Sequence, residues 1–290
     1  MKIIFNFNNF LAISEKMFQE NNKYPIRLED VADEMKLSIT TLRKYLRLEN
    51  KIHPNSIPDY FYSLQYKLHN FDFLTLESSY WLGYLFADGC YTFDHAKKGT
   101  RLMLECKIAD KEILEKFCDF LNIRHSRITI GHKGQSVALS LADSNFSTSV
   151  SKWGVCMNKS HIENHVPRDI LNNDKLFFQF LRGIIDGDGT IHTYKQSPGI
   201  SFVSNSELFC QEIKEKLQNV LPVPSSVWIT KKEKEAMEKA TQPLYSLKIG
   251  VGGSRKRINN NIDFLFHNMY EGHKIILTRK YEAFQKLRVE

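Results

Sequence analysis

The sequence predicts an α+β fold of two similar halves, preceded by a small all-α domain. A nine-residue segment occurs at residues 81–89 and again at residues 181–189, and the same order of expected strands and helices follows each copy. The first 58 residues show helical spacing of apolar side chains. We therefore expect a helical domain at 1–58, a first half at 70–165 and a second half at 166–290.

Composition is that of an ordinary globular protein with a mild positive charge. The 290 residues are 42% hydrophobic and 25% charged, close to average usage. Lys and Arg number 40 against 33 Asp and Glu, so the formal net charge is +7. This excess is compatible with a nucleic-acid partner but does not require one.

Nothing in the sequence suggests secretion or a membrane span. Apolar stretches fall far short of the roughly 18–20 residues that a span needs, and the N-terminus lacks a secretory cleavage site. The five cysteines are scattered and never form C-x-x-C, which argues against a disulfide framework or a zinc site. We expect an intracellular, reducing compartment: the cytoplasm of a bacterium or phage-infected cell, or an organelle matrix.

The N-terminal 58 residues predict three short helices. Apolar residues from Phe10 to Phe18 recur at helical spacing, a second segment runs over 28–35, and Ser38 is the expected N-cap of a third over 39–48. The last two resemble a DNA-binding helix-turn-helix, although Lys36 stands where the turn usually has Gly and must adopt a strained backbone or another turn. The expected DNA contacts are Thr40, Thr41, Arg43, Lys44 and Arg47. The alternative is a purely structural three-helix domain with solvated Arg and Lys side chains. Residues 50–60, with two prolines, predict a linker.

The two nonamers predict a pair of buried helices that pack closely. They read Trp-Leu-Gly-Tyr-Leu-Phe-Ala-Asp-Gly and Leu-Arg-Gly-Ile-Ile-Asp-Gly-Asp-Gly. Small residues four apart, Gly83 with Ala87 and Gly183 with Gly187, lie on one helix face and allow close approach of the two helices. Gly89 and Gly189 suit left-handed C-terminal caps. Each helix then carries an Asp at its C-terminal end.

The segments that follow each nonamer alternate in the same way. A hairpin, a helix, two strands and a helical tail are expected in turn, and residues 102–108 alternate apolar and polar side chains as a half-buried strand does. In the first half these elements cover 90–108, 110–121, 127–132, 136–141 and 144–153. In the second half they cover 190–203, 205–220, 226–231, 245–251 and 258–267.

The paired acids Asp88 and Asp188 predict a divalent metal site. A carboxylate at a helix C-terminus is disfavoured by about 0.3–1 kcal/mol, and two neighbouring acids repel. A hard cation such as Mg²⁺ between them reverses this, because it takes carboxylate and carbonyl oxygens. The last helix carbonyls, including those of Ala87 and Gly187, are free to help. Such metals can activate water and stabilise the leaving oxygen of a phosphodiester.

The nonamers and their spacing resemble the double-motif LAGLIDADG homing endonucleases over roughly residues 70–285. The resemblance implies two αββαββα halves, an interface of motif helices, and acids (Asp88 and Asp188) that bind Mg²⁺ or Mn²⁺ and cleave one DNA strand each. The sixth motif position, usually acidic, is Phe86 and Asp186 here. That position does not ligate metal in the family, so this departure concerns packing.

The resemblance also implies a sheet face over the DNA major groove. The expected contacts lie opposite the apolar strand faces, and for each the alternative is a solvated strand surface. They are Arg101, Glu105, Lys107, Arg127 and Thr129 in the first half, and His192, Tyr194, Ser201, Lys231, Ser246 and Lys248 in the second. Phosphates could be held by Lys231, Lys232, Lys234, Lys239 and the cluster at 255–257.

The family often places a lysine near the metals. Lys159, in a segment that resembles the end of a first half, is the first candidate. Lys280 lies in a segment that resembles a family tail, with exposed helix surface as the alternative.

The sequence thus favours a site-specific, metal-dependent double-strand DNA endonuclease. We expect a monomer that is free-standing or intron-encoded and that acts on a long, asymmetric DNA site. The alternative is a non-cleaving relative, either an RNA maturase or a DNA-binding regulator. The presence of both Asp88 and Asp188 favours the enzyme, because a pure binding protein needs neither.

Overall fold

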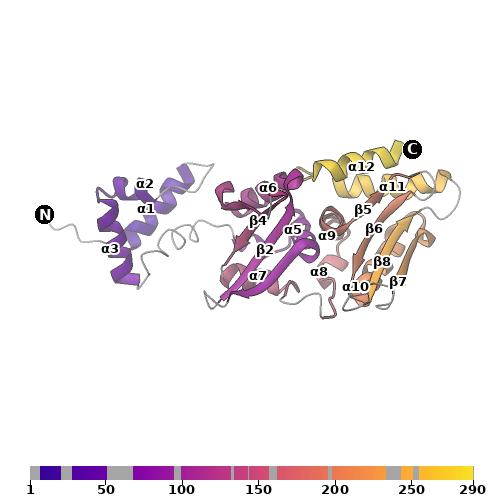
Figure 1. Cartoon of the computed structure of the whole chain (residues 1–290), viewed down its shortest axis with the longest axis horizontal. Coiled ribbons are helices and arrows are strands. Elements are labelled where there is room, and N and C mark those ends of the chain that lie inside the picture. Colours follow the sequence, from indigo (N-terminus) through magenta and orange to yellow (C-terminus); the bar gives the residue numbers. More distant parts are fainter. Residues whose placement is uncertain are drawn as a thin grey trace. The chain divides into compact units, whose positions relative to one another are not determined.

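The computed structural model describes residues 7–20, 28–50, 68–94, 99–131, 134–142, 144–156, 162–194, 198–232, 243–250 and 255–289 (Figure 1). Its contacts divide the chain into two compact units. The first is Met1–Leu68 with Phe117–Arg127, and the second is His69–Lys116 with Ile128–Glu290. The described part contains no helix long and apolar enough to cross a membrane.

The first unit contains three helices around a small apolar core. They are α1 (Phe7–Glu20), α2 (Leu28–Glu34) and α3 (Ile39–Asn50). Their buried side chains are Phe10, Leu28, Val31, Ala32, Leu42 and Leu46, with Leu37 packed against them. Ala32 and Leu42 thus lie inside this core, and Leu37 packs against it.

The connection between α2 and α3 has a strained backbone at Lys36. Its φ of 55° lies in the left-handed region, which costs a non-glycine residue roughly 1–2 kcal/mol. The Leu37 amide donates to the Ala32 carbonyl at 2.8 Å, which closes this turn. The Ser38 hydroxyl then accepts from the Thr41 amide at 3.1 Å, so Ser38 is the N-cap of α3 as predicted. Of the two possibilities raised by the absent glycine, the strained backbone is the one adopted.

From residue 76 onward the chain repeats one order of elements twice, in the second unit except for residues 117–127. The first half contains α5 (Leu76–Asp88), β1 (Gly89–Asp94), β2 (Gly99–Lys107), α6 (Lys111–Leu121), β3 (Ile128–Ile130), β4 (Ser136–Leu141) and α7 (Ser144–Ser151). The second contains α9 (Asp174–Asp188), β5 (Thr190–His192), β6 (Gly199–Ser204), α10 (Glu207–Val220), β7 (Val227–Lys232), β8 (Leu244–Gly250) and α11 (Arg255–Tyr270). The predicted α+β fold with two αββαββα halves is confirmed.

Short elements join these. They are the 3-10 turns η2 (Leu68–Phe71), η3 (Ile108–Asp110), η4 (His125–Arg127) and η7 (Pro224–Ser226), and the helix α8 (Arg168–Leu171). A further helix, α12 (Thr278–Val289), follows α11 and contacts both α11 and β5. This helix lies beyond the last element that we expected from the sequence.

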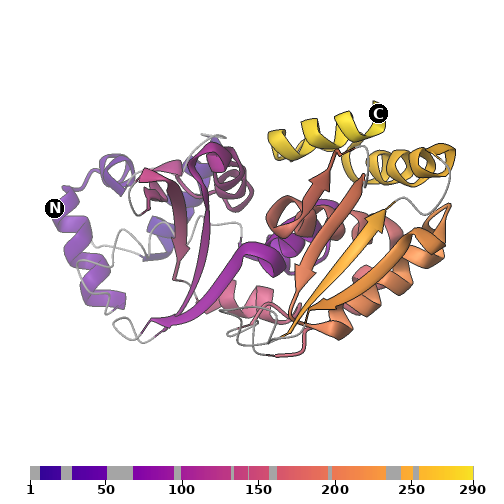
Figure 2. The ribbon, with the colours of Figure 1, turned by 45° about the vertical axis from the view of Figure 1, so that its right-hand side comes forward.

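The two sheets have the same topology. Their strand orders are β1-β2-β4-β3 and β5-β6-β8-β7, and each neighbouring pair is antiparallel. In each, a hairpin forms one side and the next two strands in sequence form the other. Helix α10 packs against β6, β7 and β8, and the four strands of the second sheet lie side by side in Figure 2.

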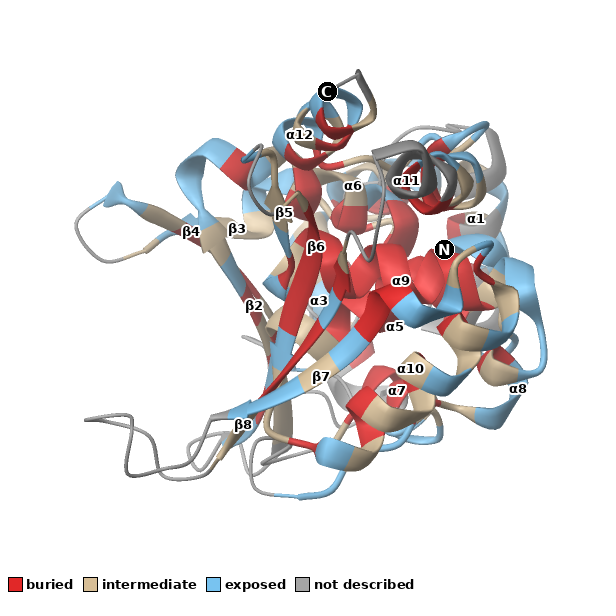
Figure 3. Cartoon of the chain, turned by 90° about the vertical axis from the view of Figure 1, so that its right-hand side faces the viewer, coloured by how far each residue is buried: buried red, intermediate tan, exposed pale blue. Residues whose placement is uncertain are grey.

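The motif helices α5 and α9 pack through their small residues, as predicted. A Cβ atom at Gly83 would overlap the Phe180 carbonyl, and one at Gly183 would overlap the Tyr80 carbonyl. Near the C-terminal ends, a Cβ atom at Gly187 would lie 2.6 Å from the Ala87 Cβ atom. Only glycine allows the two backbones to approach this closely. Both helices are mostly buried in Figure 3.

The glycines that end these helices are not left-handed caps, so that prediction is wrong. Gly89 has φ −69° and ψ 125°, and Gly189 has φ −75° and ψ 156°. Each helix runs straight into a strand, and that requires an extended backbone. Glycine is needed there for space, because a Cβ atom at Gly89 would lie 2.5 Å from the Leu85 carbonyl oxygen and one at Gly189 would lie 2.5 Å from the Ile185 Cα atom.

Candidate active site and nucleic-acid interface

The two motif acids lie at the touching ends of α5 and α9. Asp88 is half-buried and Asp188 is exposed. A Cβ atom at Gly187 would lie 3.3 Å from Asp88 Oδ2, so the first acid borders the second motif. A cavity of about 250 Å³ adjoins Asp188, with Phe86, Ala87 and Phe202 among its walls. The fold therefore brings one acid from each half to a single place.

Tyr84 orients Asp88, and the sequence analysis did not identify it. Its side chain is buried and hydrogen-bonds with the Asp88 side chain. Burial, followed by the charge of Asp88, raises the pKa of Tyr84 well above its usual value, so the hydroxyl stays protonated and donates. The fourth motif position is Ile184 in the second copy, which has no hydroxyl. The presence of Tyr in the first copy and Ile in the second, at matched positions, could have indicated a special role for Tyr84.

The sixth motif positions pack in different ways. The ring of Phe86 stacks on Phe209 at 5.5 Å between centroids and meets Phe180 edge-on at 5.3 Å. Asp186, only 1% exposed, accepts hydrogen bonds from the Tyr80 hydroxyl at 2.8 Å and the Tyr270 hydroxyl at 3.1 Å. The first half thus has an apolar contact where the second half buries a carboxylate.

Arg182 completes the group around Asp186. Its guanidinium lies over the Tyr80 ring at 4.4 Å and over the Tyr270 ring at 5.7 Å. Burial raises the pKa of Asp186 even though Arg182 and both hydroxyls favour the ionised form. The polar side chains of this group therefore join α5, α9 and α11.

Lys280 reaches the C-terminal end of α9 from α12. Its Nζ donates to the Ile185 carbonyl at 3.1 Å and also to the Gly189 carbonyl. The side chain is 6% exposed, so the alternative of an exposed helix surface is wrong. Burial, followed by the neighbouring Arg279 charge, lowers the pKa of Lys280. A cation at these carbonyls stabilises the C-terminal end of α9, the helix whose last residue is Asp188.

The donor set at the two helix ends fits a hard divalent cation. The carboxylates of Asp88 and Asp188 and the carbonyls of Ala87 and Gly187 would offer oxygen atoms, the ligands that Mg²⁺ prefers. Within the described ranges, His, Cys, Asp and Glu do not gather in groups of three or more that could hold a metal. Mg²⁺ keeps several waters and commonly needs only one or two carboxylates. Burial and nearby carboxylates raise the pKa of the Cys106 thiol to about 12, so this neighbour stays protonated.

In the first sheet, the strand register places four of the expected DNA contacts on one face. Arg101, Glu105 and Lys107 alternate along β2 with the buried Leu102 and Leu104. Thr129 of β3 pairs with Ala138, and Ala138 pairs with Glu105, so Thr129 shares their face. Arg127 lies in η4, ahead of the strand in which we expected it.

In the second sheet, His192, Ser201, Ser246 and Lys248 share one face. Ser201 and Ser246 are buried there, so their expected exposure to DNA is a correction, whereas Lys248 is exposed. Ser201 pairs with Lys248, and His192 lies 2.8 Å from the Ser201 hydroxyl. Tyr194 follows β5 and is 76% exposed. Lys231 pairs with Tyr245 and so lies on the opposite face, a correction to its expected place. Side chains of β7 alternate between the two faces of the sheet, and Val227, Ile229 and Lys231 lie on the apolar face. Our assignment of Lys231 was therefore off by one residue, which is enough to move a side chain to the other face.

Trp228 lies on the polar face of the second sheet and was missed. It pairs with Lys248 across β7 and β8, and it packs over Gly250, where a Cβ atom would overlap its ring. Trp228 stands between the apolar Val227 and Ile229, and successive side chains of a strand point to opposite faces. This pattern could have predicted that Trp228 lies on the polar face.

The remaining predicted residues lie on the first unit or outside the described residues. Thr40 and Lys44 are exposed on α3, whereas the Thr41 hydroxyl lies 2.7 Å from that of Ser38. Arg43 pairs with Glu29 at 3.4 Å. Outside the described residues lie Lys159, Lys234 and Lys239, together with the side chains of Arg47, Lys232 and residues 255–257.

A comparison with protein families identifies residues 178–264 as a LAGLIDADG-like domain. No curated protein sequence matches the chain significantly. Similar solved structures include mesophilic variants of the homing endonuclease I-DmoI, at 15% identity and TM-score 0.45, covering 68% of this chain and 97% of that one. The meganuclease I-SmaMI bound to uncleaveable DNA matches at 13% identity and TM-score 0.46, over 74% and 87%. The homing endonuclease I-GzeII with its DNA target matches at 13% and 0.44, over 72% and 88%.

Proposed function

We propose that this protein is a site-specific DNA endonuclease of the homing type, which cuts both strands of its target with a divalent metal. The observation that carries this proposal is the meeting of Asp88 and Asp188 at the ends of two glycine-packed helices, one from each half. The LAGLIDADG-like domain over residues 178–264 supports it. Each acid would act on one strand.

The position of the acids favours cleavage over binding alone. A carboxylate at a helix C-terminus opposes the helix dipole and costs about 0.3–1 kcal/mol. Two such sites at one junction destabilise a protein unless they hold a cation. The non-cleaving alternative, an RNA maturase or DNA-binding regulator, has no observation that favours it.

The residues that would hold Mg²⁺ or Mn²⁺ are Asp88 and Asp188, with the Ala87 and Gly187 carbonyls. When bound, the metal supplies Lewis-acid stabilisation of the phosphodiester and a more acidic water. Tyr84 holds the Asp88 carboxylate in place through its hydroxyl. Lys280 would hold a positive charge at the C-terminal end of α9, where it could offset charge that develops on the phosphate.

The partner in this proposal is double-stranded DNA, bound by the polar faces of both sheets. The first face presents Arg101, Glu105 and Lys107, and the second presents His192 and Lys248. Because the two faces differ, the target should be asymmetric. One chain provides both acids, which is consistent with a monomeric enzyme. The first unit would add contacts through α3, and Lys159 stays a candidate for a second lysine near the metals.

The experiment that tests this function is the selection of cleaved sites from a randomised DNA library. The full chain is incubated with the library and Mg²⁺ or Mn²⁺, with the Asp88→Asn, Asp188→Asn double variant as a matched blank. We expect one sequence family to be cut on both strands by the wild type only. If the double variant cuts equally well, the acid pair is not the active site. If neither protein cuts but the wild type retains one preferred duplex, the protein is a binding relative.

A further inference from the structure

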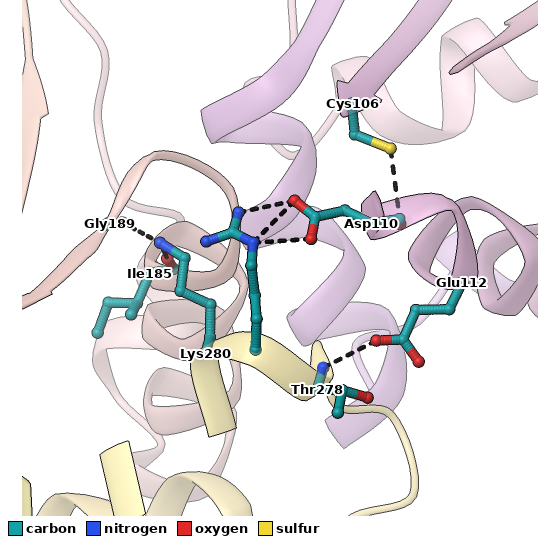
Figure 4. A network of polar contacts seen from close by, with 8 residues as sticks. Cys106, Asp110, Glu112, Ile185, Gly189, Thr278 and Lys280 are labelled. Carbon is teal, nitrogen blue, oxygen red and sulfur yellow. Dashed lines mark hydrogen bonds and ion pairs between the residues drawn. The ribbon is translucent and has the colours of Figure 1, made fainter. Parts of the chain in front are cut away.

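Polar contacts connect the start of α12 to the first half (Figure 4). All of the residues involved belong to the second unit. Lys116 Nζ donates to the Ile276 carbonyl at 2.6 Å, and the Thr278 amide donates to Glu112 Oε1 at 2.9 Å. Arg279 donates to both carboxylate oxygens of Asp110, with Nε at 2.7 and 2.9 Å and the terminal nitrogen at 2.7 Å. The C-terminal helix of the second half is therefore held by η3 and α6 of the first.

The Asp110–Arg279 pair is the most specific of these contacts. Its two-pronged geometry fixes both the distance and the orientation of the guanidinium, which a single contact does not. Asp110 has a side chain only 7% exposed, so removing its partner leaves a carboxylate largely out of water. The Cys106 thiol also donates to the Asp110 carbonyl at 3.6 Å, which ties this residue to the end of β2.

Arg279 is the direct neighbour of Lys280 in the first turn of α12. Fixing the Arg279 side chain fixes the backbone from which Lys280 extends. Lys280 then bonds the Ile185 and Gly189 carbonyls on either side of Asp188. Arg279 pairs with Asp110 of the first half. Lys280 extends from the same turn of α12 to the Ile185 and Gly189 carbonyls at the end of α9 (Figure 4).

We propose that the Asp110–Arg279 ion pair is a positioning contact that holds Lys280 at the Ile185 and Gly189 carbonyls, at the end of α9 where the motif acids lie, so that the first half sets the place of a lysine at the site. Asp110 and Arg279 are thus positioning residues, because they act through Lys280 on the reacting phosphate. This inference rests on the proposed nuclease function for its kinetic consequence. The holding of Lys280 itself does not depend on that function.

The kinetic test asks whether Arg279 acts through Lys280. Single-turnover cleavage of the selected DNA site is measured for the wild type, Arg279→Gln, Asp110→Asn, Lys280→Met and the Arg279→Gln, Lys280→Met double variant. We expect each single change to lower the rate about 10–100-fold, since small misplacements cost that much, with DNA Kd changed less than about threefold. In the Lys280→Met background, Arg279→Gln should cause no further loss.

A merely structural role gives a different pattern. Losses that multiply in the double variant would mean that Arg279 acts independently of Lys280, and would overturn the proposal. So would an unchanged rate in Lys280→Met. Arg279→Lys keeps the charge without the two-pronged contact and should fall between wild type and Arg279→Gln. It also serves if the glutamine variant folds poorly.

A second measurement needs no cleavage. Acetylation of each lysine in the full chain is followed by mass spectrometry under native conditions. Lys280 should be protected in the wild type and acetylated at least about tenfold faster in Arg279→Gln, while Lys216 on α10 is unchanged. The matched control is Arg288→Gln. Arg288 also lies on α12, and its Nε pairs with Asp263 Oδ1 of α11 at 2.8 Å, so this change removes a different ion pair of the same helix. Equal protection in Arg279→Gln and wild type would overturn the proposal, whether or not the protein cuts DNA.

Discussion

The Tyr84 hydroxyl hydrogen-bonds the Asp88 carboxylate, and no equivalent hydroxyl exists at Ile184 beside Asp188. The two halves share a strand order but not the immediate surroundings of their acids. Asp88 is half-buried with a tyrosine partner, and Asp188 is exposed next to carbonyls that Lys280 binds. We expect the two acids to contribute unequally to cleavage.

Tyr84→Phe should slow the cut that depends on Asp88 more than the other cut, by about tenfold, since one oriented hydrogen bond to a charged group is lost. Nicked DNA should then accumulate, which strand-specific end labels on a denaturing gel will show. Tyr91→Phe is the matched control, because the buried Tyr91 hydroxyl has no hydrogen-bond partner within the described structure. Equal slowing of both strands would count against the orienting role.

Replacing either acid should abolish double-strand cleavage without abolishing binding. Asp88→Asn and Asp188→Asn each remove a metal-binding charge but keep the side-chain shape. DNA affinity should stay within about tenfold, because phosphate contacts from basic residues dominate affinity. Gel-shift titration at fixed salt and a plasmid linearisation assay measure the two effects separately. A variant that still linearises plasmid would refute the mechanism with two acids.

Gly83→Ala should destabilise the protein by about 1–3 kcal/mol or more, the usual cost of forcing atoms into a packed site. The new methyl group would overlap the Phe180 carbonyl of the facing helix. Thermal and urea unfolding report the change. As a control, Gly134→Asn enters open space at a positive φ of 69°, which asparagine tolerates, and should change stability little.

Stability should depend on pH through Asp186. Burial raises its pKa above the unfolded value of 3.8, so its protonated form favours the fold. Its contribution is fully present below the unfolded pKa and is lost as the pH rises through the higher folded value. Asp186→Asn lacks this titration, so wild-type stability should fall relative to the variant between pH 4 and the folded pKa. Urea unfolding of both proteins across that range measures the difference, and a constant difference would contradict the prediction.

Lys44→Ala should weaken DNA binding uniformly across sequences if α3 contacts DNA. Loss of one phosphate contact lowers the slope of log affinity against log salt by about 1. Binding titrations at several salt concentrations give this slope. Lys175→Ala, an exposed lysine at the start of α9, is the control. Identical slopes for Lys44→Ala and wild type would favour the structural reading of the three-helix domain.

Local sequence patterns were sufficient to predict most of the elements of the fold. The repeat, with glycine at positions 83 and 183, was sufficient to predict the paired helices and their close contact, because only small residues permit it. Alternation along β2 predicted which of its side chains share a face. Lys231 was misplaced because a one-residue offset of register moves a side chain to the other face, and register is set by pairing with β8. Gly89 and Gly189 were misread because each helix passes into its strand with an extended backbone at the glycine, without a left-handed residue between them.

The sequence by itself determined that two acids stand at equivalent places in a duplicated unit, since a repeat is visible without coordinates. Only the tertiary structure decided what surrounds those acids. Tyr84 reaches Asp88 within one helix, but Asp110, Arg279 and Lys280 are separated by up to 170 residues of chain (110 to 280) before they meet. Contacts of that kind depend on how the halves close on each other, and no local spacing encodes them.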